Sequence, residues 1–178
     1  MKRCTEDKDV LNRFEQLTFK DQDYSNQDLS YQVYQDCTFI NCNFTNVLVK
    51  GTRFQSVIFK GCRFLGVIFS VCNPFLLSMR FEECQILSSA FSELKLPKTI
   101  FLRCQIHETD FINTDLTEAE FDGSDLDRTM FHNANLSYAS FIGAEHYRFD
   151  PHKNILKKTK LSFPEAISLL YVFDVIIK

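Results

Sequence analysis

Phenylalanines recur in this chain at a spacing of twenty residues, and this spacing constrains the fold more than any other feature of the sequence. Seven of them form one series, with a single two-residue slip after the third: Phe19, Phe39, Phe59, Phe81, Phe101, Phe121 and Phe141. No ordinary helix or sheet requires a period of twenty. A solenoid with twenty-residue coils does, because each coil places the same bulky group at the same point of a shared core. This series, the phenylalanine column, therefore predicts a solenoid.

Each coil divides into four parts, because apolar residues also recur every five positions. These central positions hold 15 of the 19 phenylalanines. Two positions before most centres lies a small or compact residue, such as Cys62, Thr109 or Ala134. Large and small side chains that alternate toward one interior fill a narrow tube without voids. An eight-stranded barrel would instead show alternation at period two and turn signals every ten residues, which this sequence lacks.

The repeats resemble those of the pentapeptide-repeat family, whose unit is a small residue, Asp or Asn, and then Leu or Phe. The matching units are Thr109-Asp110-Phe111, Thr114-Asp115-Leu116, Ala119-Glu120-Phe121, Ser124-Asp125-Leu126 and Ala134-Asn135-Leu136. The resemblance implies an all-β fold, a right-handed quadrilateral β-helix. We expect an N-terminal cap over 1–13 and the β-helix over 14–149, with a register slip near 70–80. The low glycine count of 5 argues against a calcium-binding β-roll.

Seven cysteines raise the question of a metal site or of disulfides. Four of them, Cys42, Cys62, Cys84 and Cys104, fall on one side of the coil and would form a ladder inside it. Metal ligands have to converge, whereas these thiols would stand in line. We interpret them as compact apolar side chains that fill small inward positions, and expect neither metal nor cofactor. Free thiols are typical of a reducing compartment, which favours a cytoplasmic location.

The sequence contains no motif of a known catalytic site. His107, His132, His146 and His152 are scattered along the chain. No apolar run approaches the length of a membrane span, and Met1-Lys2-Arg3 is followed by charged residues rather than by the apolar core of a signal peptide. We therefore expect a protein that is not an enzyme and does not enter a membrane.

Acidic residues are concentrated late in the chain. Residues 101–150 carry 10 Asp and Glu against 3 Lys and Arg. Asp110, Asp115, Glu120 and Asp125 precede four successive centres, so they should ring one coil with one on each side. A narrow rod with regularly spaced acid can mimic duplex DNA, although an acid before the centre also belongs to the repeat itself. The candidate partner-binding residues are Glu108, Asp110, Asp115, Glu118, Glu120, Asp122, Asp125, Asp127 and Glu145.

The five-residue period stops after residue 149, which predicts a C-terminal capping and dimerisation module over 150–178. Ser162-Phe163-Pro164-Glu165 is typical of a capping box, followed by a helix to about Phe173. Asp174 then ends the helix, and Val175-Ile176-Ile177 is expected to form a short strand. The segment is too apolar for a helix with one buried face, which predicts a second chain across a two-fold axis. The candidate dimerisation residues are Phe163, Ile167, Leu169, Leu170, Tyr171, Phe173, Val175 and Ile177.

This tail resembles that of the Qnr/MfpA-type topoisomerase-binding proteins, on the strength of Asp150, Pro151, Pro164, Glu165, Ala166, Leu169 and Leu170. The resemblance implies a homodimeric DNA mimic that binds DNA gyrase or topoisomerase IV and modulates or protects it, with quinolone resistance as a consequence. The chain departs from the plasmid-borne branch, because it lacks long projecting loops. The alternative hypothesis is a β-helical scaffold or interaction module without a topoisomerase target, which uses outward apolar residues such as Leu48 and Ile68. A third reading is that the acid only keeps the rod soluble.

Overall fold

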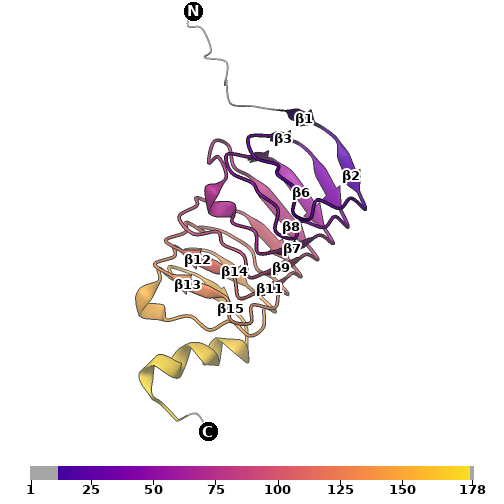
Figure 1. Cartoon of the computed structure of the whole chain (residues 1–178). Coiled ribbons are helices and arrows are strands. Elements are labelled where there is room, and N and C mark those ends of the chain that lie inside the picture. Colours follow the sequence, from indigo (N-terminus) through magenta and orange to yellow (C-terminus); the bar gives the residue numbers. More distant parts are fainter. Residues whose placement is uncertain (1–11, 177–178) are drawn as a thin grey trace, which may run out of the picture.

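The computed structural model describes residues 12–176, and in them the chain winds as a right-handed quadrilateral β-helix (Figure 1). Almost all of the N-terminal cap expected over 1–13 lies outside the described residues. Residues one coil apart pair in parallel: Phe19 pairs with Phe39, and Phe81 pairs with Phe101. The prediction of a solenoid with twenty-residue coils is confirmed.

Each coil has four faces, numbered here in chain order, and short parallel strands stack along each of them. The first face holds β1 (Arg13–Glu15), β3 (Val33–Gln35) and β5 (Arg53–Gln55). The second holds β2 (Thr18–Lys20), β4 (Thr38–Ile40), β6 (Val57–Lys60), β8 (Met79–Glu82) and β10 (Ile100–Leu102), and farther along β14 (Ser140–Phe141) and β15 (Lys160–Leu161). The third holds β7 (Arg63–Leu65), β9 (Gln85–Leu87) and β11 (Gln105–His107). The fourth holds β12 (Asp110–Ile112) and β13 (Met130–His132).

The chain turns between faces at residues with a left-handed backbone. Two positions after most centres φ is positive, as at Asn46 (52°), Asn113 (55°) and Asn133 (51°). Such a φ is strained for most side chains and easier for Gly, Asn and Asp. A three-residue strand followed by such a turn explains why the sequence period is five.

The interior of the tube is filled by stacked aromatic rings. Along the phenylalanine column, successive ring centroids lie 4.8 to 5.3 Å apart from Phe19 to Phe141. A second stack on the fourth face joins Phe69, Phe91, Phe111 and Phe131. Rings on neighbouring faces meet edge to face, as do Phe101 and Phe111, and both geometries are favourable for aromatic pairs. Burial of these rings is the main contribution to stability.

The cysteine ladder lies in the interior as compact side chains. Cys42, Cys62, Cys84 and Cys104 are each about 1% exposed and form no disulfide. The first three thiols donate to backbone carbonyls of the coil below, as Cys62 Sγ does to the Phe39 carbonyl at 3.4 Å. Ser124 continues the ladder, and its Oγ accepts the Cys104 N–H at 2.9 Å. The interpretation of the cysteines as packing residues agrees with this arrangement.

The two-residue slip occupies one corner of the rod. The 3-10 helix η1 (Phe69–Val71) precedes it, and the buried Cys72 still occupies an inward position. The extra residues bulge outward, so that Phe75 and Leu76 are 59% and 65% exposed. The strand ladder of the first face ends at β5 and resumes only as the bridge between Lys95 and Asp115. The slip thus interrupts the first face, whereas the second and third faces stay paired throughout and the fourth lacks only the pairing of Leu48 with Ile68.

The coil continues beyond residue 149, into the segment assigned to the C-terminal module. Ile155 bridges to Asn135, and β15 pairs with β14. In the segment between β14 and β15, the side chains of Tyr147 and Phe149 are buried against Phe141 and close the interior. The five-residue period therefore pauses at this closure and at the 3-10 helix η2 (Pro151–Lys153), and then resumes at Leu156 and Leu161.

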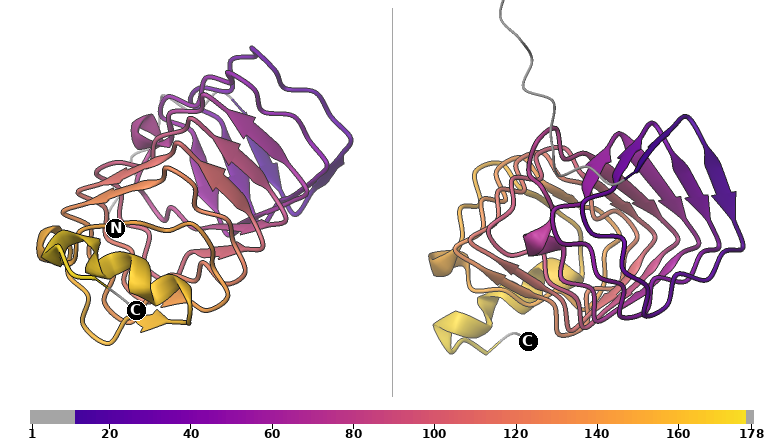
Figure 2. Two further views of the ribbon diagram at one scale, coloured as in Figure 1. Left: turned by 90° about the horizontal axis from the view of Figure 1, so that it is seen from below. Right: turned by 45° about the horizontal axis from the view of Figure 1, so that its top comes forward.

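The chain ends in the 3-10 helix η3 (Glu165–Phe173), which lies across the end of the solenoid (Figure 2). The predicted helix is present and ends at Asp174, which has a left-handed φ of 50°. The predicted capping box is wrong, because the Ser162 hydroxyl accepts the Gly143 N–H instead and no side chain caps the helix. The predicted strand at Val175-Ile176 is also wrong within the described residues, because both residues lie outside any strand; Ile177 is not among the described residues. The short strand of this region is β15. Within 12–176 no helix is long and apolar enough to span a membrane.

Candidate protein-interaction surfaces

The acidic residues before four successive centres ring one coil, as predicted. Bridges place Asp110 on the fourth face beside Ala90, Asp115 on the first face beside Lys95, Glu120 on the second face beside Ile100, and Asp125 on the third face beside Gln105. They point in four directions and do not converge on one site. A partner that contacts one side of the rod can use only part of this acid.

Many of these carboxylates are engaged by groups of the same chain. Arg128 pairs with Glu108 at 2.7 Å and with Asp127 at 3.1 Å. Asp115 accepts the backbone N–H and the hydroxyl of Thr117, which fixes a local turn. Glu145 is exposed on the third face next to Asp125. Part of the acid on the first, third and fourth faces therefore serves the repeat or is partly neutralised.

The acid that gathers most closely lies on the second face and its corner. Glu118, Glu120 and Asp122 line one shallow hollow together with Tyr138, Ser140 and Lys160. Glu118 reaches Lys98 only at 3.7 Å, and Glu120 has no ion pair with any residue that the structure describes. Asp122 accepts the Ile142 N–H at 3.2 Å. These three carboxylates are the strongest candidates for a cationic partner.

Asp125 joins two histidines that are 39 positions apart in the sequence. Its Oδ2 lies 2.8 Å from His107 Nε2 and its Oδ1 lies 2.7 Å from His146 Nδ1. The hydrogen bond and the negative charge of Asp125 raise the pKa of His146 above 6.5. Burial alone would raise the pKa of Asp125, but the hydrogen bonds from His146 and His107 outweigh it and lower that pKa. In the sequence these histidines are scattered, and they lie close together only because the coils stack.

Within the described residues, no group of three or more His, Cys, Asp or Glu side chains could hold a metal ion. The three residues of the Asp125 cluster instead lie on successive coils and are joined by the two hydrogen bonds of Asp125. These contacts tie the third face together.

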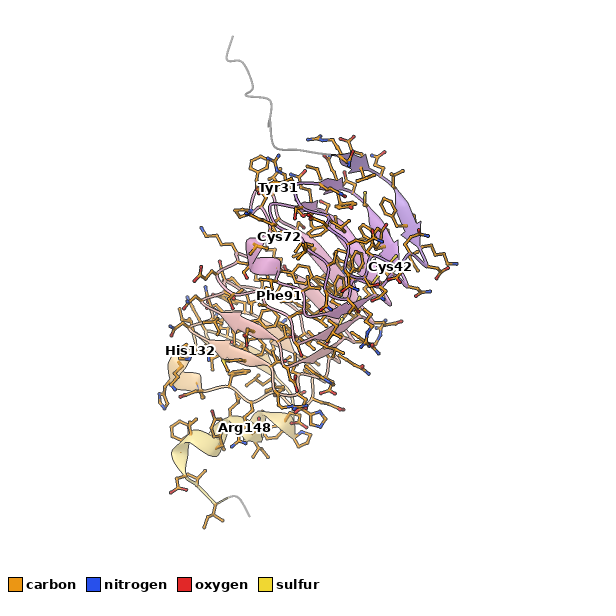
Figure 3. The ribbon with its side chains drawn as sticks, viewed as in Figure 1. Tyr31, Cys42, Cys72, Phe91, His132 and Arg148 are labelled. Carbon is orange, nitrogen blue, oxygen red and sulfur yellow. The ribbon has the colours of Figure 1, made fainter. Side chains whose placement is uncertain are left out.

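The candidate dimerisation residues fall into two sets. Leu169 is 6% exposed and belongs to the chain's own core, so in this conformation it cannot face a partner. Phe163, Phe173 and Val175 are 84%, 50% and 54% exposed. Leu170 and Tyr171 are also exposed, Ile167 is half-buried, and Ile177 lies outside the described residues. Tyr171 carries the Arg148 guanidinium 4.2 Å above its ring (Arg148 is labelled in Figure 3).

A second surface lies on the fourth face of the N-terminal coils. Leu48 and Ile68, the outward apolar residues noted in the sequence, are 58% and 55% exposed. They line one hollow with Tyr31 and Val71, which the sequence analysis did not single out. The position of Val71 directly before the slip could have indicated that its side chain is exposed.

The pentapeptide repeat region is the family model that this chain matches, over residues 33–111 and 75–149. The two matches span more than half of the chain, which therefore belongs to the pentapeptide-repeat family. No curated protein sequence matches the chain.

Among solved structures, the chain is similar to two forms of QnrB1, a plasmid-mediated fluoroquinolone resistance protein. They are 16% identical to it, with TM-scores of 0.67 and 0.68, over 96% of this chain and 92% of QnrB1. HetL, a pentapeptide-repeat protein from the cyanobacterium Nostoc involved in regulating heterocyst differentiation, is 13% identical with a TM-score of 0.40, over 88% of each chain. At these identities the similarity to QnrB1 concerns the fold.

Proposed function

We propose that this chain is a non-enzymatic, cytoplasmic protein that binds DNA gyrase or topoisomerase IV in place of DNA. The observation that carries the proposal is the row of Glu118, Glu120 and Asp122, which runs across one face of a single coil near the end that bears η3. A topoisomerase binds duplex DNA through basic grooves, which a rod with exposed carboxylates can also enter. The fold shared with QnrB1 supports this choice of partner.

We further propose that two copies associate through the C-terminal module. The exposed apolar side chains of Phe163, Leu170, Phe173 and Val175 support this contact. A two-fold contact would place the Glu118–Asp122 rows of both copies on one longer rod. Protection of the enzyme from quinolones belongs to this proposal, although the slip at Phe75 and Leu76 is the only bulge within 12–149.

The direct test is competition for gyrase. The protein is titrated against gyrase bound to a fluorescent DNA duplex, at low and at high salt, and displacement is measured by anisotropy. We expect displacement that weakens as salt rises, because the contact is made by charge. Absence of displacement by the wild-type protein at low salt would overturn the proposal.

A charge-reversed variant tests the site within that experiment. Glu118→Lys with Glu120→Lys should abolish displacement, since both side chains are exposed and point into one hollow. The matched control is Asp36→Lys with Glu93→Lys, which makes the same charge change at exposed positions outside that hollow. Equal displacement by both variants would show that only the net charge matters. Sedimentation of the wild type beside Leu170→Glu tests the dimer, and a monomeric wild type would refute it.

The alternative function, an interaction module without a topoisomerase target, is favoured by the hollow at Leu48 and Ile68. Partner capture through that surface would survive high salt, whereas capture through the acidic row would not. Wild-type protein that captures a partner only at low salt would favour the acidic row.

A further inference from the structure

The hollow on the fourth face is mostly apolar and open to solvent. It is lined by Asp28, Ser30, Tyr31, Asn46, Val47, Leu48, Val49, Lys50, Gly66, Ile68 and Val71. Large side chains that remain exposed together in one hollow are typical of binding surfaces. Leu48 and Ile68 occupy positions before the centre, where the acidic coils carry Asp110 on this same face.

The register slip opens this hollow. The rungs of the fourth face on either side of the hollow are hydrogen-bonded. In the rung before it, the Leu29 N–H donates to the Leu48 carbonyl at 2.9 Å; in the rung after it, the Phe69 N–H donates to the Ala90 carbonyl at 2.8 Å. Between Leu48 and Ile68 the ladder has a gap: the N–H groups of Val49 and Ile68 make no hydrogen bond within the described chain. The coils are therefore separated at this rung. The gap adjoins η1, the 3-10 turn that leads into the slip.

Two glycines let side chains of the hollow pack closely against the backbone at its corners. The Tyr31 ring lies over Gly51, so close that an added Cβ would lie 2.7 Å from Tyr31 Cδ1. The Asn46 side chain covers Gly66 in the same way. The Gly51 N–H donates to the Val71 carbonyl at 2.8 Å, which places η1 beside this corner. Figure 3 shows Tyr31 on the same side of the rod as Cys72, the residue that follows η1.

The spacing of the exposed side chains suits a helix laid along the rod. Hydrogen-bonded strands stack about 4.8 Å apart, and the unpaired rung between Leu48 and Ile68 is wider than this, toward the rise of about 5.4 Å of one α-helical turn. Apolar residues one helical turn apart would therefore contact Leu48 and Ile68 together. The same line of outward positions holds Asp28 before Leu48, and Ala90 and Asp110 after Ile68. Ala90 is small and allows a helix to continue over it.

The charged residues at the two ends of this line of outward positions indicate which charges a bound helix would have. Asp28 and Asp110 are four rungs apart, at least about 19 Å since one rung is widened, which equals at least about 13 residues of α-helix. Asp28 is held ionised, because hydrogen bonds from Ser30 lower its pKa. Lys50 lies to one side of the hollow. A complementary helix has basic residues at both ends, apolar residues at the centre and an acidic residue toward Lys50.

We propose that this hollow is a docking groove for an amphipathic helix of a partner protein, with an apolar centre and basic ends. Side chains in the groove supply the affinity, as in other helix-in-groove complexes. The residues that line the hollow lie on a different face, and on different coils, from Glu118, Glu120 and Asp122, and only Asp110 at the end of the line shares a coil with Glu120. It is independent of topoisomerase binding, and failure of either proposal leaves the other intact.

The probe is a set of three alanine-based peptides of about 14 residues. The first carries lysines at both ends and two leucines at i and i+4, which share a helix face. The second has the same composition with the leucines at i and i+2, which share a face only in a strand. The third replaces the lysines by glutamates. Each is titrated into the 15N-labelled full chain, and shifts of the amides over 46–51 and 66–71 are followed.

We expect the first peptide to shift these amides saturably, and the other two to bind at least about tenfold more weakly. Leu48→Glu with Ile68→Glu should abolish the shifts, whereas Met130→Glu, at an exposed apolar position of the same face outside the groove, should not. The proposal is overturned if the first peptide does not bind at millimolar concentration. Tighter binding of the second peptide would also overturn it, in favour of an extended occupant. Thermal unfolding of each variant confirms that it folds.

Discussion

The rings of Phe81 and Phe101 lie parallel, with an angle of 1° between their planes and 5.1 Å between their centroids. Phe81 is the first residue of the phenylalanine column after the slip, and it also stacks on Phe59 before the slip at 5.1 Å. The two extra residues are thus absorbed entirely outside the core. Stability should depend on the column and hardly at all on the side chains of the slip.

Phe101→Ala tests the contribution of the column. The side chain is fully buried and contacts Phe81 and Phe121 above and below it, so truncation should cost roughly 3–5 kcal/mol of unfolding free energy. Phe75→Ala is the matched control, because this phenylalanine lies in the slip and is 59% exposed. Urea denaturation of the three proteins measures the difference. Similar losses in both variants would contradict the assignment of the column to the core.

The cysteine ladder should be chemically inert in the folded protein. The hydrogen bond with Cys84, together with burial, raises the pKa of the Cys62 thiol, and burial raises that of the Cys84 thiol. The thiolate is the reactive form of cysteine. In a Cys4→Ser variant, a disulfide reagent should therefore modify none of the remaining thiols until the chain unfolds. Ser56→Cys, at an exposed corner, provides a positive control that should react at once. Rapid modification of the ladder in the native protein would refute this expectation.

Replacement of Cys62 by serine should be tolerated better than replacement by leucine. The next position of the ladder after Cys104 is already a serine, Ser124, whose hydroxyl donates to the Phe101 carbonyl at 2.7 Å. A serine at position 62 can donate to the Phe39 carbonyl in the same way, whereas leucine would overfill the tube. The melting temperatures of the two variants check this. A leucine variant as stable as the serine variant would mean that the site has spare volume.

The sequence predicted the repetitive part of the fold because each coil repeats the same local choices. The phenylalanine column, the small residues before the centres and the strand register all follow from the five-residue period. The end of the chain could not be predicted in this way. There Ser162 had two possible acceptor roles, as a helix cap and as a partner of the Gly143 N–H, and only the position of the last coil decides between them. Tyr147 and Phe149 likewise break the period and yet are buried.

The candidate sites were predicted less completely, because they depend on which faces lie together. One acid on each side of the coil followed from spacing alone. The contacts of Asp125 with His107 and His146 did not, because they join residues 18 and 21 positions apart, which the twenty-residue period does not place side by side. The hollow at Leu48 needed the slip and Gly51 together, and neither indicates a hollow by itself.

The pair between His146 and Asp125 gives the stability a pH dependence. The pKa of His146 is raised in the folded state, so its stabilising contribution is complete below the unfolded value of about 6.5 and is lost as pH rises through the folded pKa. The pKa of Asp125 is lowered, so its contribution is present above the unfolded value and is lost as pH falls through the folded pKa. NMR titration of His146 should show a pKa that drops toward 6.5 in Asp125→Asn. Asp127→Asn, which removes a carboxylate bonded to Arg128, is the control and should leave that titration nearly unchanged.

Gly51 and Gly143 have the same backbone conformation, with φ of 67°, but different surroundings. At Gly143 the nearest atom to an added Cβ is 3.8 Å away, so Gly143→Ala should cost only the strain of a left-handed alanine, about 1 kcal/mol. At Gly51 the added Cβ would also lie 2.7 Å from the Tyr31 ring, so Gly51→Ala should cost more. Tyr31→Ala in the Gly51→Ala background should remove the excess, which a double-mutant cycle of urea denaturation measures. Equal losses at the two glycines would mean that the Tyr31 ring moves freely, and the corner of the groove would then not be fixed.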